Sequence, residues 1–164
     1  MSNELIVKKE GQLPLLKSQL KGIEHRRSQF KVTIRKVELP KNNDFNEKIA
    51  WICSTFGIFE NIDKNKNAAS IFKEIFLATT TGQVITSTVI AERLGLSRGA
   101  TINHLNNLLK SGLIEKGGKY YFARSKTIEG IINEIEDDLI HIFSRMKRIA
   151  KEIDQDLPKV IQMK

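Results

Sequence analysis

Two short helices separated by a glycine-containing turn are the feature that most constrains the fold of this chain. They lie within residues 87–111, STVIAERLGLSRGATINHLNNLLKS. Gly95 can end the first helix and Ser97 can cap the second, which ends before Gly112. Two helices joined by a turn of about four residues that contains Gly form a helix-turn-helix unit. The residues of the first helix that are spaced to pack inward are Ile90, Ala91 and Leu94.

The second helix, about residues 97–111, has one apolar side and one side rich in asparagine. The apolar side consists of Thr101, Leu105, Leu108 and Leu109. The other side, within an arc of about 80°, consists of Gly99, Asn103, Asn106, Asn107 and Lys110. Asparagine has only a middling helix propensity, so three on one face indicate a purpose other than helix stability. An Asn amide can bind adenine N6 and N7 in the DNA major groove, and ordinary solvated surface amides remain the alternative.

The segments on either side of this unit complete a recognisable order of elements. Residues 68–78 predict a helix capped by Asn67, and residues 83–86 predict a short strand. Residues 113–123 predict two strands joined by a Gly-Gly loop at positions 117 and 118, where both residues can take a positive φ. The order helix, strand, helix, helix, hairpin is that of a winged helix.

Residues 84–123, VITSTVIAERLGLSRGATINHLNNLLKSGLIEKGGKYYFA, resemble the winged-helix DNA-binding domain of MarR and ArsR transcriptional regulators and of TrmB-like archaeal regulators. The resemblance covers about residues 68–125 and implies a mainly α fold with a small β-hairpin wing, of the α+β type. It also implies that the recognition helix, about 97–111, enters the major groove and that the wing, 113–123, lies on the DNA backbone. The acidic-arginine wing motif typical of MarR proteins is absent from this sequence.

Carried over residue by residue, the resemblance implies a set of DNA contacts. The residues that it places at the major groove, at a phosphate or in the wing are Thr88, Ser97, Arg98, Gly99, Ala100, Asn103, Asn107, Lys116 and Lys119. The exposed face of the recognition helix adds Asn106 and Lys110 to this set.

The first third of the chain is predicted to be a basic arm followed by one helix. Residues 1–44 form the arm, in which the alternating apolar residues of 30–39 predict a strand that Pro40 ends. Residues 45–67 predict a helix capped by Asp44, followed by a polar connector. The inward stripe of this helix is predicted to be Phe45, Ile49, Ile52, Cys53 and Phe56.

The C-terminal segment, residues 126–157, predicts a long helix that ends at Pro158, with residues 158–164 as a tail. Its apolar residues alternate at spacings of four and three, the 3.5-residue repeat of a coiled coil, and packing within the chain is the alternative. Acidic residues fill its first half and basic residues its second, so we expect an antiparallel dimer centred near His141 and Ile142, with Glu134 close to Lys151 of the other chain. The predicted dimerisation residues are Ile128, Ile132, Ile135, Leu139, Ile142, Met146, Ile149 and Ile153.

Composition restricts the possible partners. The net charge is +8, and residues 68–125 carry seven Lys and Arg against three Asp and Glu, so a polyanion is a plausible partner. One cysteine and three scattered histidines give no metal cluster, and no cofactor motif or catalytic arrangement is present, so we expect no metal, no cofactor and no enzymatic activity. No apolar stretch approaches the length of a membrane span, and we expect a cytoplasmic protein.

The sequence therefore predicts a homodimeric, sequence-specific regulator of transcription that binds double-stranded DNA. Two alternatives remain: a winged helix that serves as a protein-interaction or assembly module of a transcription or chromosome complex, and an RNA-binding protein. Neither the target operator, an effector, nor the sign of regulation follows from the sequence.

Overall fold

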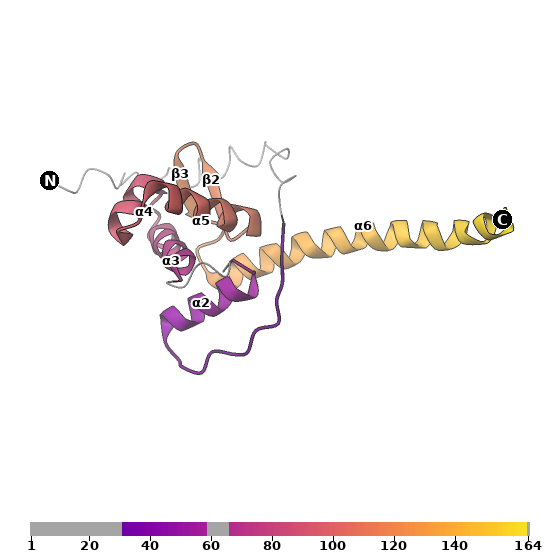
Figure 1. The fold of residues 1–164 in the computed structure, drawn as a ribbon, viewed down its shortest axis with the longest axis horizontal. Coiled ribbons are helices and arrows are strands. Elements are labelled where there is room, and N and C mark those ends of the chain that lie inside the picture. The colour runs from indigo at the N-terminus through magenta and orange to yellow at the C-terminus, as the bar shows by residue number, and fades with distance from the viewer. Residues whose placement is uncertain (1–30, 59–65, 164) are drawn as a thin grey trace. The chain divides into compact units, whose positions relative to one another are not determined.

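The computed structural model describes residues 31–58 and 66–163 (Figure 1). It is mainly helical with one small antiparallel sheet, as the sequence predicts. The chain divides into two units, the second of which begins at Ile128, and each unit is described by itself. The elements of the first unit are α2 (Phe45–Thr55), α3 (Asn67–Thr80), β1 (Ile85–Thr86), α4 (Ser87–Leu94), α5 (Arg98–Ser111), β2 (Ile114–Gly117) and β3 (Tyr120–Ala123). The second unit is the single helix α6 (Ile128–Gln162).

Helix α3 lies at the centre of the first unit. It contacts α2, α4, α5 and β3, and it is the most deeply buried helix of the unit because both sides of it meet other elements. Ile71, Phe72 and Ile75 are fully shielded from solvent, as are Leu105 and Leu108 of α5. Removing such side chains from water is the main force that holds a domain of this size together.

The sheet has three strands in the order β1-β3-β2, all antiparallel. Its hairpin differs from the prediction by one residue, because Gly117 pairs with Tyr120 and the two-residue loop is therefore Gly118 and Lys119. Gly118 has φ +60°, whereas Gly117 stays within the strand. The third strand comes from β1, which precedes the helix-turn-helix unit.

The predicted strand at 30–39 is wrong over the described residues, since 31–40 are extended but belong to no sheet. Their backbone instead meets helix ends: Lys31 N donates to Lys110 O at 3.0 Å, and Arg35 N donates to Thr55 O at 2.8 Å. The last carbonyls of a helix have no hydrogen-bond donor within the helix. Lys31 and Arg35 therefore donate their N–H groups to the C-terminal ends of α5 and α2 and not to a neighbouring strand. Ile34 is 63% exposed, which breaks the predicted inward alternation.

The predicted caps and stripes of α2 and α3 are partly confirmed. The side chain of Asp44 accepts from Glu47 N at 3.0 Å and so caps α2 as predicted. Phe45 is 48% exposed and does not join the buried stripe, since it is the first residue of the helix. Asn67 is the first residue of α3, not its cap; the cap is Lys66, which is left-handed with φ 52° and makes no side-chain capping bond.

Helix α6 is longer than predicted. It runs through Pro158 to Gln162, so the predicted end at 157 and the tail from 158 are wrong. Proline costs a helix one backbone hydrogen bond and some distortion, yet α6 continues for four residues past Pro158. Ile131 and Ile135 are buried, whereas the large apolar side chains from Ile140 onward are exposed.

Candidate nucleic-acid interface

The turn between α4 and α5 is built as the sequence indicates. Thr86 caps α4 by accepting from Val89 N at 3.4 Å, and Gly95 ends α4 in the left-handed conformation with φ 64°. The Leu96 N–H then donates to Ala91 O at 2.9 Å, which closes the turn. Ser97 Oγ accepts from Ala100 N at 3.2 Å, so the start of α5 is fixed by its own cap.

Helix α5 separates its two faces as predicted. Thr101, Leu105 and Leu108 are fully buried, and Thr101 Oγ1 donates back to Ser97 O at 3.0 Å. On the opposite face Asn103, Asn106 and Lys110 are exposed and Asn107 is half-buried. Leu109, predicted to be buried, is only half-buried.

The amides of this face are available to a ligand. No hydrogen bond joins the side chain of Asn103, Asn106 or Asn107 to any other residue that the structure describes. Each amide offers a donor pair and an acceptor on one plane, which is the arrangement that pairs with the major-groove edge of adenine. Within residues 31–58 and 66–163, exposed side chains without hydrogen bonds thus lie together on one stripe of α5.

The N-terminal end of α5 is also open. Ser97, Arg98 and Gly99 are exposed, and Ala100 is half-buried. A Cβ atom added to Gly99 would meet no other atom within 4 Å, so nothing in the chain itself requires glycine there. The free N–H groups and positive dipole end of a helix suit a phosphate, and Arg98 adds a cation at the same place.

A shallow hollow of about 350 Å³ brings two predicted contacts together. Thr88 of α4 and Arg98 of α5 both line it, with Ala91, Glu92, Gly95 and Leu96 completing the wall. Thr88 is exposed, as a phosphate contact must be. Within this hollow the Glu92 carboxylate repels a phosphate, whereas the Arg98 guanidinium attracts one.

The wing positions its two lysines over aromatic rings. The Lys116 Nζ lies 5.4 Å from the centroid of the Tyr121 ring, and the Lys119 Nζ lies 5.4 Å from that of Tyr120. Such cation–π contacts restrict where a long side chain points, and both lysines remain exposed. The wing therefore presents two held positive charges next to its tip.

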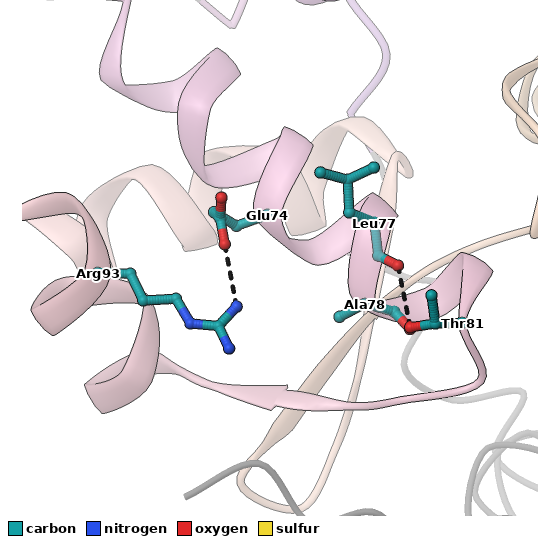
Figure 2. A network of polar contacts seen from close by, with 5 residues as sticks. All are labelled: Glu74, Leu77, Ala78, Thr81 and Arg93. Carbon is teal, nitrogen blue, oxygen red and sulfur yellow. Dashed lines mark hydrogen bonds and ion pairs between the residues drawn. The ribbon is translucent and has the colours of Figure 1, made fainter. Parts of the chain in front are cut away.

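Other basic side chains of the unit have internal partners. Arg93 of α4 reaches across to Glu74 of α3, with 3.1 Å between Nη1 and Oε2, as Figure 2 shows. Lys73 donates to Asn46 Oδ1 at 2.9 Å, and Arg124 is 7% exposed. Thr81 Oγ1 lies 2.9 Å from Ala78 O and 3.3 Å from Leu77 O, and Figure 2 shows the contact with Leu77, which closes the end of α3. Arg93 and Lys73 are therefore engaged within the fold, and Arg124 is shielded from solvent.

Thr79 helps to position the wing, and the sequence did not single it out. It is fully buried in α3, donates to Ile75 O at 2.9 Å and accepts from Ala123 N of β3 at 2.7 Å. The hydroxyl thus supplies the bond that a longer β1 would have given to Ala123, and it ties the wing to α3. The three consecutive threonines at the end of α3 were the only signal, and only one of them is buried with a partner in the sheet.

Three further features are the single cysteine, the possible metal ligands and the possible membrane spans. Cys53 is fully buried in α2, and the described residues hold no group of three potential metal ligands. Among the described helices, none is long and apolar enough to cross a membrane.

The order of elements from α3 to β3 and the exposed face of α5 are those of a winged helix-turn-helix domain. Comparison with known families agrees: the family described as winged helix-turn-helix DNA-binding matches residues 82–115. Those residues comprise β1, α4, α5 and the start of β2, which is the part that carries most of the predicted contacts. No curated protein and no solved structure matches the chain.

Proposed function

We propose that this chain is a homodimeric, sequence-specific DNA-binding regulator of transcription, with α5 in the major groove and the β2–β3 wing on the backbone. The resemblance of its sequence to MarR, ArsR and TrmB-like regulators supports a regulatory role. The proposed role is one of binding and not of catalysis, exercised in the cytoplasm.

The amide face of α5 is the observation that carries this proposal. Asn103 and Asn106 are exposed, form no bond within the described chain, and occupy helix positions where Glu, Lys or Ala would stabilise better. A general basic surface would bind DNA without needing amides, whereas amides discriminate between bases. The face therefore supports sequence recognition in addition to charge attraction.

The stripe of α6 supports a homodimer. Ile142, Met146, Ile149 and Ile153 are 43% to 60% exposed, Ile128, Ile132 and Leu139 are half-buried, and Ile135 is buried. A repeating apolar stripe left in water favours a partner helix, and a second copy joined by a two-fold axis would offer two recognition helices to DNA. Such helices bind half-sites one turn of the duplex apart, about 34 Å, or a multiple of it, so the preferred sequence is a near-palindrome.

Replacing one amide tests the proposal. Asn103→Ala is expected to cost about 1 to 3 kcal/mol of binding free energy on the preferred sequence and to relax specificity at one base pair, because a base contact is lost. Asn133→Ala is the matched control, since it removes an exposed helical amide of α6 and should leave DNA binding unchanged. Titrations of labelled duplexes measure both.

Two other results would redirect the proposal. An equal loss on every sequence would make Asn103 a phosphate contact, and no duplex binding at low salt would favour a protein-interaction or assembly module. Preference for RNA is the least supported, because RNA-binding surfaces stack bases on exposed aromatic rings. Of the three aromatic rings of β3, Tyr121 and Phe122 are 3% and 0% exposed, and Tyr120 is half-buried.

A further inference from the structure

The exposed part of the α6 stripe lies nearer the C-terminus than the sequence alone suggested. Ile131 and Ile135 are 0% and 2% exposed in the single chain, so a partner helix gains little by covering them. Every large apolar side chain of the stripe and its flanks from Ile140 to Ile161 is at least 43% exposed. The segment that gains most from pairing is therefore centred near residue 150 and not near 141.

The residues that flank this seam differ sharply on its two sides. The seam itself consists, in heptad order, of Ile135, Leu139, Ile142, Met146, Ile149, Ile153, Asp156 and Val160. One flank is apolar through the exposed segment and consists of Phe143, Ala150 and Leu157. The other flank alternates in sign at every seventh residue and consists of Asp138, Arg145, Glu152 and Lys159. Flanking charges set the orientation and register of a coiled coil.

From this pattern we infer that α6 pairs antiparallel with α6 of a second copy in one register, with Met146 opposite Ile149 and the two-fold axis between residues 147 and 148. The inference rests on the proposed homodimer and states which residues form it. In antiparallel pairs like flanks meet, so the charged flank of one helix faces that of the other. This register sets Arg145 against Glu152 and Asp138 against Lys159, and two-fold symmetry repeats both pairs.

The apolar flank fits the same register. Phe143, which is 55% exposed in the single chain, comes to lie against Ala150 of the second helix, so a large side chain meets a small one. The exposed seam residues Ile142 and Ile153 face each other. One layer is imperfect, because the charged Asp156 of one helix faces Leu139 of the other. The Asp156 carboxylate forms an ion pair with Lys159 of its own helix, with 3.0 Å between Oδ1 and Nζ.

Other arrangements bring like charges together. A parallel pair would place the two Asp156 residues opposite each other and would leave the charged flank against the apolar one. Sliding one antiparallel helix by one heptad toward the N-terminus sets Arg145 against Arg145, and sliding it the other way sets Glu152 against Glu152. A slide of two heptads toward the N-terminus avoids these clashes, but it pairs the already buried Ile135 and leaves Lys159 and Leu157 with no residue of the second helix opposite them.

Charge reversal tests the register in the full-length protein. Arg145→Glu and Glu152→Arg should each raise the dimer dissociation constant about tenfold, because each turns two symmetric attractions into repulsions. The double variant should restore the wild-type constant, since the pair is merely exchanged. Arg148→Glu is the matched control: it reverses a charge on the outer face and should leave dimerisation unchanged. Sedimentation equilibrium measures all four.

Cross-linking distinguishes the neighbouring registers. A short bismaleimide should join an Arg145→Cys chain to a Glu152→Cys chain when the two proteins are mixed, and the native Cys53 is fully buried and does not compete. Cross-linking of Asp138→Cys to Arg145→Cys in its place, or failure of the double variant to recover, would overturn the register while leaving a dimer. A wild-type protein that sediments as a monomer would overturn both the register and the homodimer, whereas the Asn103→Ala titration judges DNA recognition independently.

Discussion

Thr79→Val is the substitution that tests most sharply how the wing is held. Valine keeps the shape and the approximate helix propensity of threonine but removes the hydroxyl that accepts from Ala123 N at 2.7 Å. Ala123 is fully buried, so its N–H would lose its partner without gaining water. An unsatisfied buried donor costs about 1 to 3 kcal/mol. The valine methyl also cannot stay 2.7 Å from a nitrogen, so β3 must move as well.

Urea unfolding followed by circular dichroism measures this cost. Thr80→Val is the matched control, because Thr80 is exposed and its hydroxyl bonds only to Phe76 O at 2.8 Å, one turn earlier in the same helix. We expect Thr79→Val to lower the free energy of unfolding by about 1 to 3 kcal/mol and Thr80→Val to change it by less than about 0.5 kcal/mol. Equal effects of the two substitutions would refute the assignment of Thr79 as the tie between α3 and the wing.

Two further substitutions separate folding from binding. Gly99→Ala should leave the chain as stable as the wild type or up to about 1 kcal/mol more stable, because the added methyl meets nothing within 4 Å. The same variant should bind DNA more weakly if the α5 backbone approaches the duplex there, and unchanged affinity would remove Gly99 from the interface. Lys119→Ala should weaken binding to all sequences alike and reduce the slope of log affinity against log salt by about one, as fluorescence titrations over a salt series can measure; a sequence-dependent loss would contradict a backbone role for the wing.

The helix-turn-helix unit was predictable because its signals are local. Gly95 and Ser97 each act within one turn of their own position, so the helix end and the cap predicted from the sequence are found in the structure. The spacing of Leu105 and Leu108 likewise settles which side of α5 is buried. Because the two leucines fix the buried side of α5, the Asn residues must lie on its exposed side, and that side is the candidate site.

The predictions that were wrong or missing concern segments whose structure depends on residues far away in the sequence. Alternating apolar residues at 31–39 are compatible with a strand, but no sheet edge receives them, and the helix ends at Thr55 and Lys110 take their N–H groups. The bond from Ala123 to Thr79 joins residues 44 positions apart, and no local pattern announces it. Pro158 marks a helix end in most contexts, whereas here α6 continues past it.

The central claim, that two α5 helices read a DNA sequence together, is tested most directly by selecting bound duplexes from random DNA with the full-length protein. The account predicts enrichment of an inverted repeat whose half-site centres lie a whole number of helical turns apart, about 10 base pairs or a multiple of it, with A·T pairs at the positions that Asn103 and Asn107 reach. It also predicts affinity that falls by orders of magnitude between about 50 and 200 mM salt. No enriched sequence, together with no duplex binding at about 50 mM salt, would contradict the claim.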